Sequence, residues 1–159
     1  MTEDRWKPDD KAALGAVRFF ERLLCHPKGP MAGQPFRLEP WQREIMTQLF
    51  GQKDRRTGLR RYRRAFIELP RGNGKTSWAA GVALLMLLAD NEPAAEIFGA
   101  AADRDQARLA FDIAKAMVED SPYLRKLVKV YRNSIVCEST RSVYRVLSAE
   151  AYSKHGLNP

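Results

Sequence analysis

Little in this sequence supports a disulfide-stabilised, zinc-binding or membrane-spanning protein. Its 159 residues include only two cysteines, Cys25 and Cys137, and two histidines, too few for a disulfide framework or a zinc ligand set. The first residues, Met-Thr-Glu-Asp-Arg-Trp, lack the apolar core of a signal peptide, and the longest apolar run, 78–89, is too short to cross a bilayer. We therefore expect a cytoplasmic protein with reduced thiols and no membrane contact.

Acidic residues are scarce relative to basic ones, and the imbalance belongs to one half of the chain. The net charge is +8, because residues 1–79 carry 17 Lys and Arg against 9 Asp and Glu, whereas residues 80–159 carry 10 of each. The length, with 45% hydrophobic and 29% charged residues, is typical of one soluble domain with a core. The basic half favours a polyanion as ligand or partner, either nucleic acid or nucleotide.

Residues 68–77, Glu-Leu-Pro-Arg-Gly-Asn-Gly-Lys-Thr-Ser, have the features of a phosphate-binding loop. Two glycines allow a tight turn in which backbone N–H groups converge on phosphate oxygens. Lys75 would hold the β- and γ-phosphates, and the Thr76 hydroxyl would be a ligand of Mg²⁺. The loop is atypical, since Leu69 stands where the full motif has its leading glycine. The predicted nucleotide-binding groups belong to Gly72, Asn73, Gly74, Lys75, Thr76 and Ser77.

The elements around this loop have the order that a nucleotide site requires. Residues 65–69 predict a short strand before it and residues 76–89 an apolar helix after it, and a second strand at 95–101 and a second helix at 103–119 follow. Two successive strand–helix units indicate a parallel sheet. This order favours nucleotide binding over the alternative, a glycine-rich helix entry with a solvated lysine.

The remaining segments predict further elements on either side. Residues 8–25 form an amphipathic helix pattern that Asp9 or Asp10 could cap, and a second helix is expected at 41–50 with Pro40 at its first position. Near the other end, apolar residues alternate between 127 and 147, which predicts a meander or hairpin of strands.

Arg71 lies inside the loop and has two interpretations. Its guanidinium could reach a γ-phosphate, where it would stabilise transition-state charge or sense the phosphate. Alternatively it could form an ion pair with Glu68 or face solvent. The residues alone leave both interpretations open.

Seven of the twelve residues between 53 and 64 are Lys or Arg, which predicts a basic loop or ribbon. This density favours contact with the phosphate backbone of DNA or with a neighbouring subunit's nucleotide, and a solvated surface loop is the alternative. Only Tyr62 offers a ring for stacking. The predicted DNA contacts are Arg60, Arg61, Arg63 and Arg64.

The segment Pro-Arg-Gly-Asn-Gly-Lys-Thr resembles the Pro-Arg-x-Asn-Gly-Lys-Ser/Thr loop of large terminase subunits of tailed bacteriophages. Residues 38–42, Leu-Glu-Pro-Trp-Gln, are also similar, and by this resemblance Gln42 would contact adenine. The tail at 147–159 looks like the lead-in to the family's second ATPase motif. The resemblance implies part of a RecA-like P-loop NTPase of the ASCE type, a three-layer α/β sandwich with a mostly parallel sheet, preceded by N-terminal helices.

The same resemblance implies three divisions and a function. Residues 1–50 would be a helical lead-in with the adenine contact, 51–64 the basic loop and 65–159 the beginning of the ATPase core. The chain would be the ATP-binding portion of a motor that packages double-stranded DNA into procapsids, using ATP and Mg²⁺, with Arg71 and Lys75 as catalytic residues. Its partners would be DNA, a small terminase subunit, a portal and further copies of itself.

The family's carboxylate motif has no counterpart in this sequence. In the family an Asp-Glu pair follows such a lead-in, but no Asp-Glu pair follows Lys75, and Glu150 is a poor substitute. The family's coupling motif and nuclease domain are missing as well, so we expect weak ATP binding and poor hydrolysis. Two alternatives stay open, a helicase-like or other nucleic-acid-dependent P-loop ATPase and a non-catalytic remnant that binds nucleotide and DNA.

Overall fold

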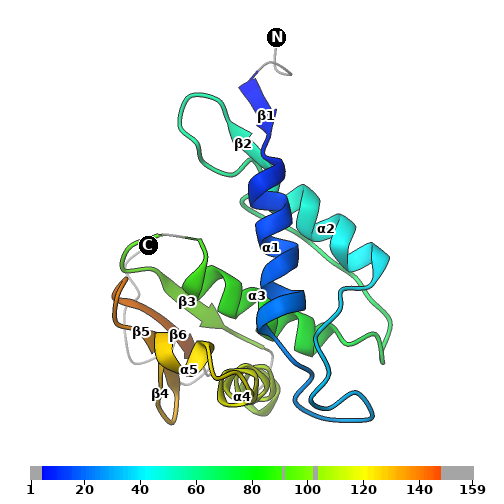
Figure 1. Cartoon of the computed structure of the whole chain (residues 1–159), viewed down its shortest axis with the longest axis vertical. Helices are drawn as coiled ribbons and strands as arrows, with labels where there is room; N and C mark the ends of the chain where they lie inside the picture. The colour runs from blue at the N-terminus through cyan, green and yellow to red at the C-terminus, as the bar shows by residue number, and fades with distance from the viewer. Residues whose placement is uncertain (1–4, 91, 102–103, 148–159) are drawn as a thin grey trace.

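The N-terminal half of the chain is a layer of helices packed beside the glycine-bearing loop. The computed structural model describes residues 5–90, 92–101 and 104–147. Helix α1 (Asp10–Leu23) packs against both α2 (Pro40–Phe50) and α3 (Lys75–Leu88), as Figure 1 shows. All three helices were predicted from the sequence. None of the helices in the described residues is long and apolar enough to cross a membrane.

Local sequence signals explain where α1 and α2 begin. The Asp9 side chain accepts a hydrogen bond from the Ala12 backbone N–H at 2.9 Å, which satisfies one of the helix's unpaired donors. In α2, Pro40 occupies the first turn, and Glu39 and Gln42 form a reciprocal capping box. The buried ring of Phe20 anchors α1 in the core.

A four-stranded mixed sheet forms the other half. Its order is β3 (Glu96–Gly99), β6 (Ser142–Val146), β5 (Ser134–Cys137) and β4 (Lys129–Val130). Only the β3–β6 pair is parallel, and the other two pairs are antiparallel. The predicted meander is thus confirmed. The prediction of a mostly parallel sheet is wrong for the described strands, because the meander supplies three of the four.

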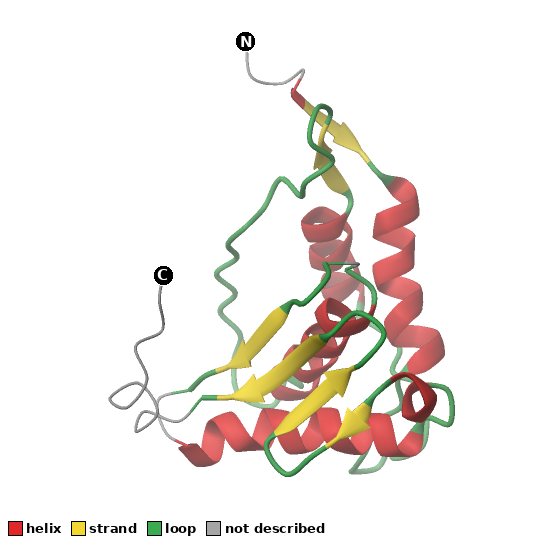
Figure 2. Cartoon of the chain, turned by 90° about the vertical axis from the view of Figure 1, so that its left-hand side faces the viewer, coloured by secondary structure: helices red, strands yellow, loops and turns green. Residues whose placement is uncertain are grey.

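Helices cover one face of this sheet in the described part of the chain. Helices α3 and α4 (Arg104–Asp120) contact β3 and β6 and lie behind the strands in Figure 2. The Phe111 and Tyr144 rings join α4 to β6, with centroids 5.5 Å apart. A short helix, α5 (Leu124–Leu127), follows α4 and was not predicted. The described residues therefore form two layers, whereas the family resemblance implied a three-layer sandwich.

The basic segment folds as a ribbon that projects from the helical layer. Strand β1 (Trp6–Pro8) pairs antiparallel with β2 (Gln52–Asp54), and the chain returns past Gly58 to pair Arg60 with Lys53. The sequence predicted a basic loop or ribbon here. The contribution of residues 6–8 was not predicted, since it depends on pairing across more than forty residues.

The strand predicted at 65–69 does not form. These residues run without regular pairing from the ribbon to the glycine-bearing loop, and Phe66 is 91% exposed. Within the described residues β3 pairs only with β6, so its other edge is open. A strand needs a neighbour for its backbone hydrogen bonds, and no described segment pairs with 65–69.

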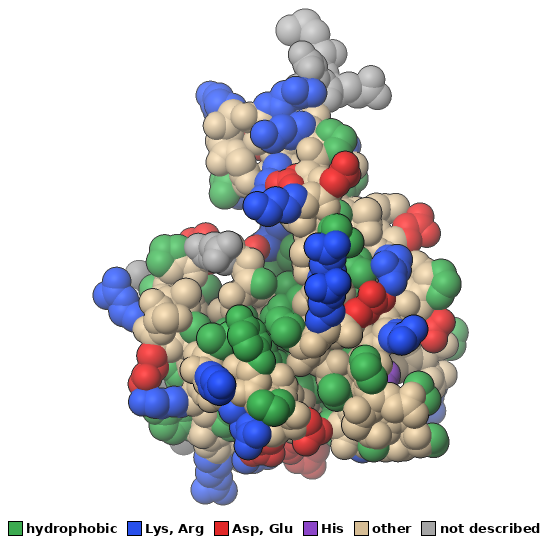
Figure 3. All heavy atoms as spheres, viewed as in Figure 1, with side chains coloured by type: hydrophobic (Ala, Val, Ile, Leu, Met, Phe, Trp, Pro, Cys, Tyr) green, Lys and Arg blue, Asp and Glu red, His purple; other side chains and the backbone are tan. Residues whose placement is uncertain are grey.

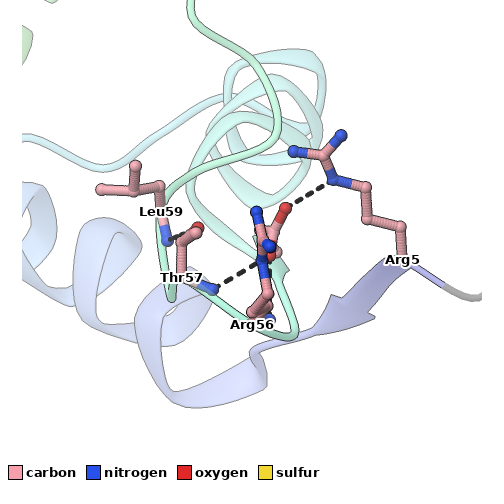
Figure 4. Close-up of polar contacts among 5 residues, drawn as sticks. Arg5, Arg56, Thr57 and Leu59 are labelled. Carbon is pink, nitrogen blue, oxygen red and sulfur yellow. Dashed lines mark hydrogen bonds and ion pairs between the residues drawn. The ribbon is translucent and has the colours of Figure 1, made fainter.

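The carboxylate of Asp54 holds the turn of the ribbon together. It accepts hydrogen bonds from Arg5 Nε and from the backbone N–H groups of Arg56 and Thr57, as Figure 4 shows in part. The Arg5 guanidinium, followed by the two backbone donors, holds the pKa of the Asp54 carboxyl well below its ordinary range. The ionised form is therefore the one that the folded ribbon prefers.

Replacing Asp54 with asparagine should destabilise the protein most at neutral pH. A carboxyl whose folded pKa is depressed stabilises the fold above its unfolded pKa, about 3.9, and loses that contribution as the pH falls below it. The difference in free energy of unfolding between the two proteins should therefore shrink between about pH 5 and pH 2. Denaturation with urea across this range measures it. The exposed Asp120, replaced in the same way, is the control and should change the free energy of unfolding at neutral pH by no more than about 0.5 kcal/mol.

Candidate nucleotide site

The loop before α3 has a backbone that two glycines make accessible. Gly72 and Gly74 have φ angles of +87° and +65°, in the left-handed region that other residues rarely adopt. Gly74 is the residue that directly precedes α3. The Asn73 side chain donates from Nδ2 to the Pro70 carbonyl at 3.3 Å, which closes the turn. An added Cβ at either glycine would meet no atom within 4 Å, so the constraint is conformational and the loop surface is open.

Backbone donors at the start of α3 are available to a ligand. The first hydrogen bond of the helix that involves the loop runs from the Trp78 N–H to the Gly74 carbonyl at 3.0 Å. The N–H groups of Lys75, Thr76 and Ser77 have no acceptor within the described residues. Unpaired N–H groups and the positive end of the helix dipole both favour an anion at this position.

The side chains of the loop face solvent or an adjoining cavity. Arg71 and Lys75 are exposed, and Thr76 is half-buried. Arg71 forms no ion pair with Glu68. Two interpretations therefore remain for this residue, a phosphate contact and a solvent-facing arginine. Both cations are free to meet a polyphosphate.

A cavity of about 820 Å³ adjoins the loop. It lies between the unpaired segment 65–69, the exposed side of α3, the open edge of β3 and α4, with Lys75 and Thr76 at its wall. The rest of its lining is mostly apolar, and none of the described residues around it is a carboxylate. The part of the chain that the structure describes thus supplies cationic and N–H groups beside the loop, but no acidic group lining the cavity to activate water.

The segment around Gln42 is held close to the loop helix. Trp41 packs edge-on against Trp78 in the first turn of α3, with ring centroids 5.5 Å apart. Gln42 is buried, and its Oε1 accepts from the Glu39 N–H at 2.9 Å. This capping role leaves Nε2 of Gln42 as its remaining donor. The buried indole N–H of Trp78 also lacks a partner among the described residues, a feature that sequence analysis missed.

The basic residues lie at the other end of α3. Arg60 forms an ion pair with Asp90, just beyond the last turn of α3, and its guanidinium lies over the Phe50 ring. Because α3 has 14 residues, the two ends are about 21 Å apart. Arg60 cannot therefore reach a nucleotide in its own loop. Asp90, its partner, carried no signal in the sequence.

The geometry of the loop fits a nucleoside triphosphate with Mg²⁺. The unpaired N–H groups, Lys75 and Arg71 could hold phosphate oxygens, and the Thr76 hydroxyl is a hard oxygen ligand of the kind Mg²⁺ accepts. The described residues contain no cluster of His, Cys, Asp or Glu that could hold a metal without the phosphates. Glu150 and the tail at 147–159, apart from residue 147, lie outside the described residues.

Comparison with known proteins identifies the family. Residues 40–159 match the family model described as terminase large subunit, ATPase domain. The chain is 31% identical over 146 residues to the terminase large subunit of Enterobacteria phage HK97, covering 90% of this chain and 28% of that protein. The crystal structure of the HK97 large terminase matches with a TM-score of 0.76 and 29% identity, over 92% of this chain and 29% of that one. The chain thus spans under a third of these relatives, and it belongs to the terminase large subunit ATPase domain family.

Proposed function

We propose that this chain binds Mg²⁺–ATP at residues 71–77 and is the ATP-binding portion of a motor that packages double-stranded DNA into procapsids. The observation that carries the proposal is the pair of left-handed glycines before α3, next to three unpaired backbone N–H groups. This arrangement supports phosphate binding on physical grounds. Family membership supports ATP as the nucleotide and packaging as the process.

Each residue of the loop has a distinct part in this proposal. Lys75 would offset charge on the β- and γ-phosphates, and the Thr76 hydroxyl would be a ligand of Mg²⁺, which would supply further positive charge beside the phosphates. Gly72, Asn73, Gly74 and Ser77 complete the cradle through their backbone. Arg71 is exposed and has no carboxylate partner in the described part, which supports a contact with the γ-phosphate, where it would stabilise developing charge.

The adenine would be recognised by the Gln42 segment. Nε2 of Gln42 is a donor that could bind a ring nitrogen of the base, and Trp41 supports the segment through Trp78. The contact between these tryptophans explains how a residue more than thirty positions before Lys75 can belong to the same site. We propose that the Gln42 segment and the loop together form part of a RecA-like ATPase core.

Hydrolysis by this chain should be slow. When bound, Mg²⁺ would polarise the γ-phosphate, but activation of the attacking water needs a general base. The described residues around Lys75 supply no carboxylate for that step. The double-stranded DNA, a small terminase subunit, a portal and further copies of the chain are partners that we propose from the family.

Calorimetric titration with ATP tests the nucleotide site. The intact chain should bind ATP in a Mg²⁺-dependent way, and Lys75→Ala should weaken binding at least roughly tenfold, since hydrogen bonds to charged groups contribute about 1.5–3 kcal/mol. Lys126→Ala, which removes an exposed lysine from α5, is the matched control and should bind as the parent does. Equal affinity in the parent and Lys75→Ala would contradict the proposal.

A single-turnover assay separates binding from catalysis. The chain should retain ATP while releasing phosphate slowly, because the described residues that line the cavity beside the loop include no carboxylate. Rapid phosphate release that Lys75→Ala abolishes would instead show that a carboxylate outside the described contacts completes the site.

A further inference from the structure

The ribbon of β1 and β2 concentrates positive charge far from the nucleotide loop. Residues 5–8 and 52–64, which we call the basic ribbon, contain nine Lys and Arg and one acidic residue, Asp54. Figure 3 shows blue side chains gathered at the end of the molecule that β1 and β2 form. The sequence had predicted the basic run at 53–64 but not the pairing that adds Arg5 and Lys7 to it. The folded ribbon is therefore a larger cationic surface than the linear segment.

Three of these cations are already neutralised by carboxylates. The pairs are Arg5 with Asp54, Lys53 with Asp9, and Arg60 with Asp90. Four exposed arginines form no ion pair with a carboxylate among the described residues, namely Arg56, Arg61, Arg63 and Arg64. The exposed Lys7 lies near enough to Asp9 to help lower the pKa of that carboxyl. Arg63 and Arg64 also line a groove of about 510 Å³ between the ribbon and the end of α3. Unpaired cations at this density attract a polyanion.

The aromatic rings of the ribbon are occupied by its own arginines. Arg5 lies 4.9 Å and Arg61 5.7 Å from the Trp6 ring centroid, and Arg61 lies 5.2 Å from that of Tyr62. Proteins that bind single strands stack bases on exposed rings. Here guanidinium groups lie against both rings and would compete with bases for them, although Tyr62 is 39% exposed, so charge is the main means of recognition. That combination suits a phosphate backbone better than unstacked bases.

We propose that the basic ribbon binds the phosphate backbone of double-stranded DNA, with Arg63 and Arg64 as direct contacts. Arg60 is excluded from the contact set because Asp90 and the Phe50 ring hold it within the fold. Arg61 lies across Trp6 and Tyr62 and is also excluded. The choice of duplex DNA rests on the proposed packaging function. The site is distinct from the nucleotide loop, which lies at the opposite end of α3.

The salt dependence of duplex binding tests the contact residues. Each phosphate contact contributes about 0.9 to the slope of log K against log salt concentration for duplex DNA. The variant R63Q/R64Q should therefore reduce the slope by about 2. The control R125Q/K126Q removes two exposed cations from α5, so it makes the same change in net charge and should leave the slope unchanged. Circular dichroism would verify that both variants fold.

Competition identifies the partner that the ribbon prefers. A random-sequence duplex should displace a labelled duplex better than poly(dT) or poly-Glu. The assay contains no ATP, so a failed nucleotide site would not hide a working ribbon. Equal slopes for R63Q/R64Q and the parent, or equal losses in R63Q/R64Q and R125Q/K126Q, would overturn the proposal. Preference for poly(dT) would overturn the duplex assignment, and preference for poly-Glu would indicate an acidic protein segment instead.

Discussion

Replacing Phe20 with alanine is expected to lower the free energy of unfolding by about 3–5 kcal/mol, the usual cost of deleting a buried aromatic ring. Phe20 is fully buried in α1 and contacts the Phe36 ring edge-on, with centroids 5.5 Å apart. Its ring also faces Gly81 in the middle of α3. The substitution would therefore leave a cavity at the point where α1 meets the helix that carries the nucleotide loop.

Urea denaturation with Phe66→Ala as the control measures this effect. Phe66 is 91% exposed, so the same chemical change there should alter stability by no more than about 0.5 kcal/mol. Because a loss of 5 kcal/mol could approach the total stability of a small domain, Phe20→Leu provides a milder variant that should still fold. A loss below about 1 kcal/mol for Phe20→Ala would contradict the packing described for α1 and α3.

Replacing Gly81 with alanine should also destabilise the protein, by about 1–3 kcal/mol, although alanine favours helices more than glycine does. A Cβ atom at Gly81 would lie 2.3 Å from one carbon of the Phe20 ring and 3.0 Å from Leu24. Phe20 and Leu24 are both buried, so neither can move aside without disturbing the core. The absence of a side chain at this position is what allows α1 and α3 to approach so closely.

Gly15→Ala is the matched control, since Gly15 lies in α1 with no atom within 4 Å of its added Cβ. That variant should gain about 0.5–1 kcal/mol from helix propensity alone. The two glycine substitutions are thus expected to change the denaturation midpoint in opposite directions. If Gly81→Ala also stabilised the protein, that result would contradict the close packing of Phe20 against Gly81.

Local patterns were sufficient to predict the four longer helices of the described residues, although not the short α5. Asp9 as a cap, Pro40 at a first turn and the spacing of apolar residues place α1 and α2 within one or two residues of their observed bounds. The same holds for α3 and α4. These signals are local, because a helix makes its hydrogen bonds within four residues and buries one face.

Pairing between distant segments was beyond the reach of such patterns. Residues 65–69 have the composition of a strand, yet a strand exists only where another strand accepts its hydrogen bonds. The open edge of β3 faces this segment across the cavity, and no described strand fills the space between them. The pairing of Trp6 with Asp54 was missed for the converse reason, because residues 6–8 have no strand-like run of their own.

The features of the candidate site also divide into those that local sequence predicts and those that depend on distant contacts. The glycines at 72 and 74 were predicted to turn the backbone, and their φ angles agree with that prediction. The roles assigned to Lys75, Thr76 and Gln42 remain predictions. The contact between Trp41 and Trp78, which brings Gln42 near the loop, could not be read from spacing because it joins two separate helices.

Helix α3 connects two surfaces with different properties. Its first residue is Lys75, in the loop proposed for ATP, and Asp90 just past its last turn holds Arg60 of the basic ribbon. The tight contact of Gly81 with Phe20 holds the middle of α3 against α1. The helix therefore acts as a spacer that keeps the two surfaces about 21 Å apart.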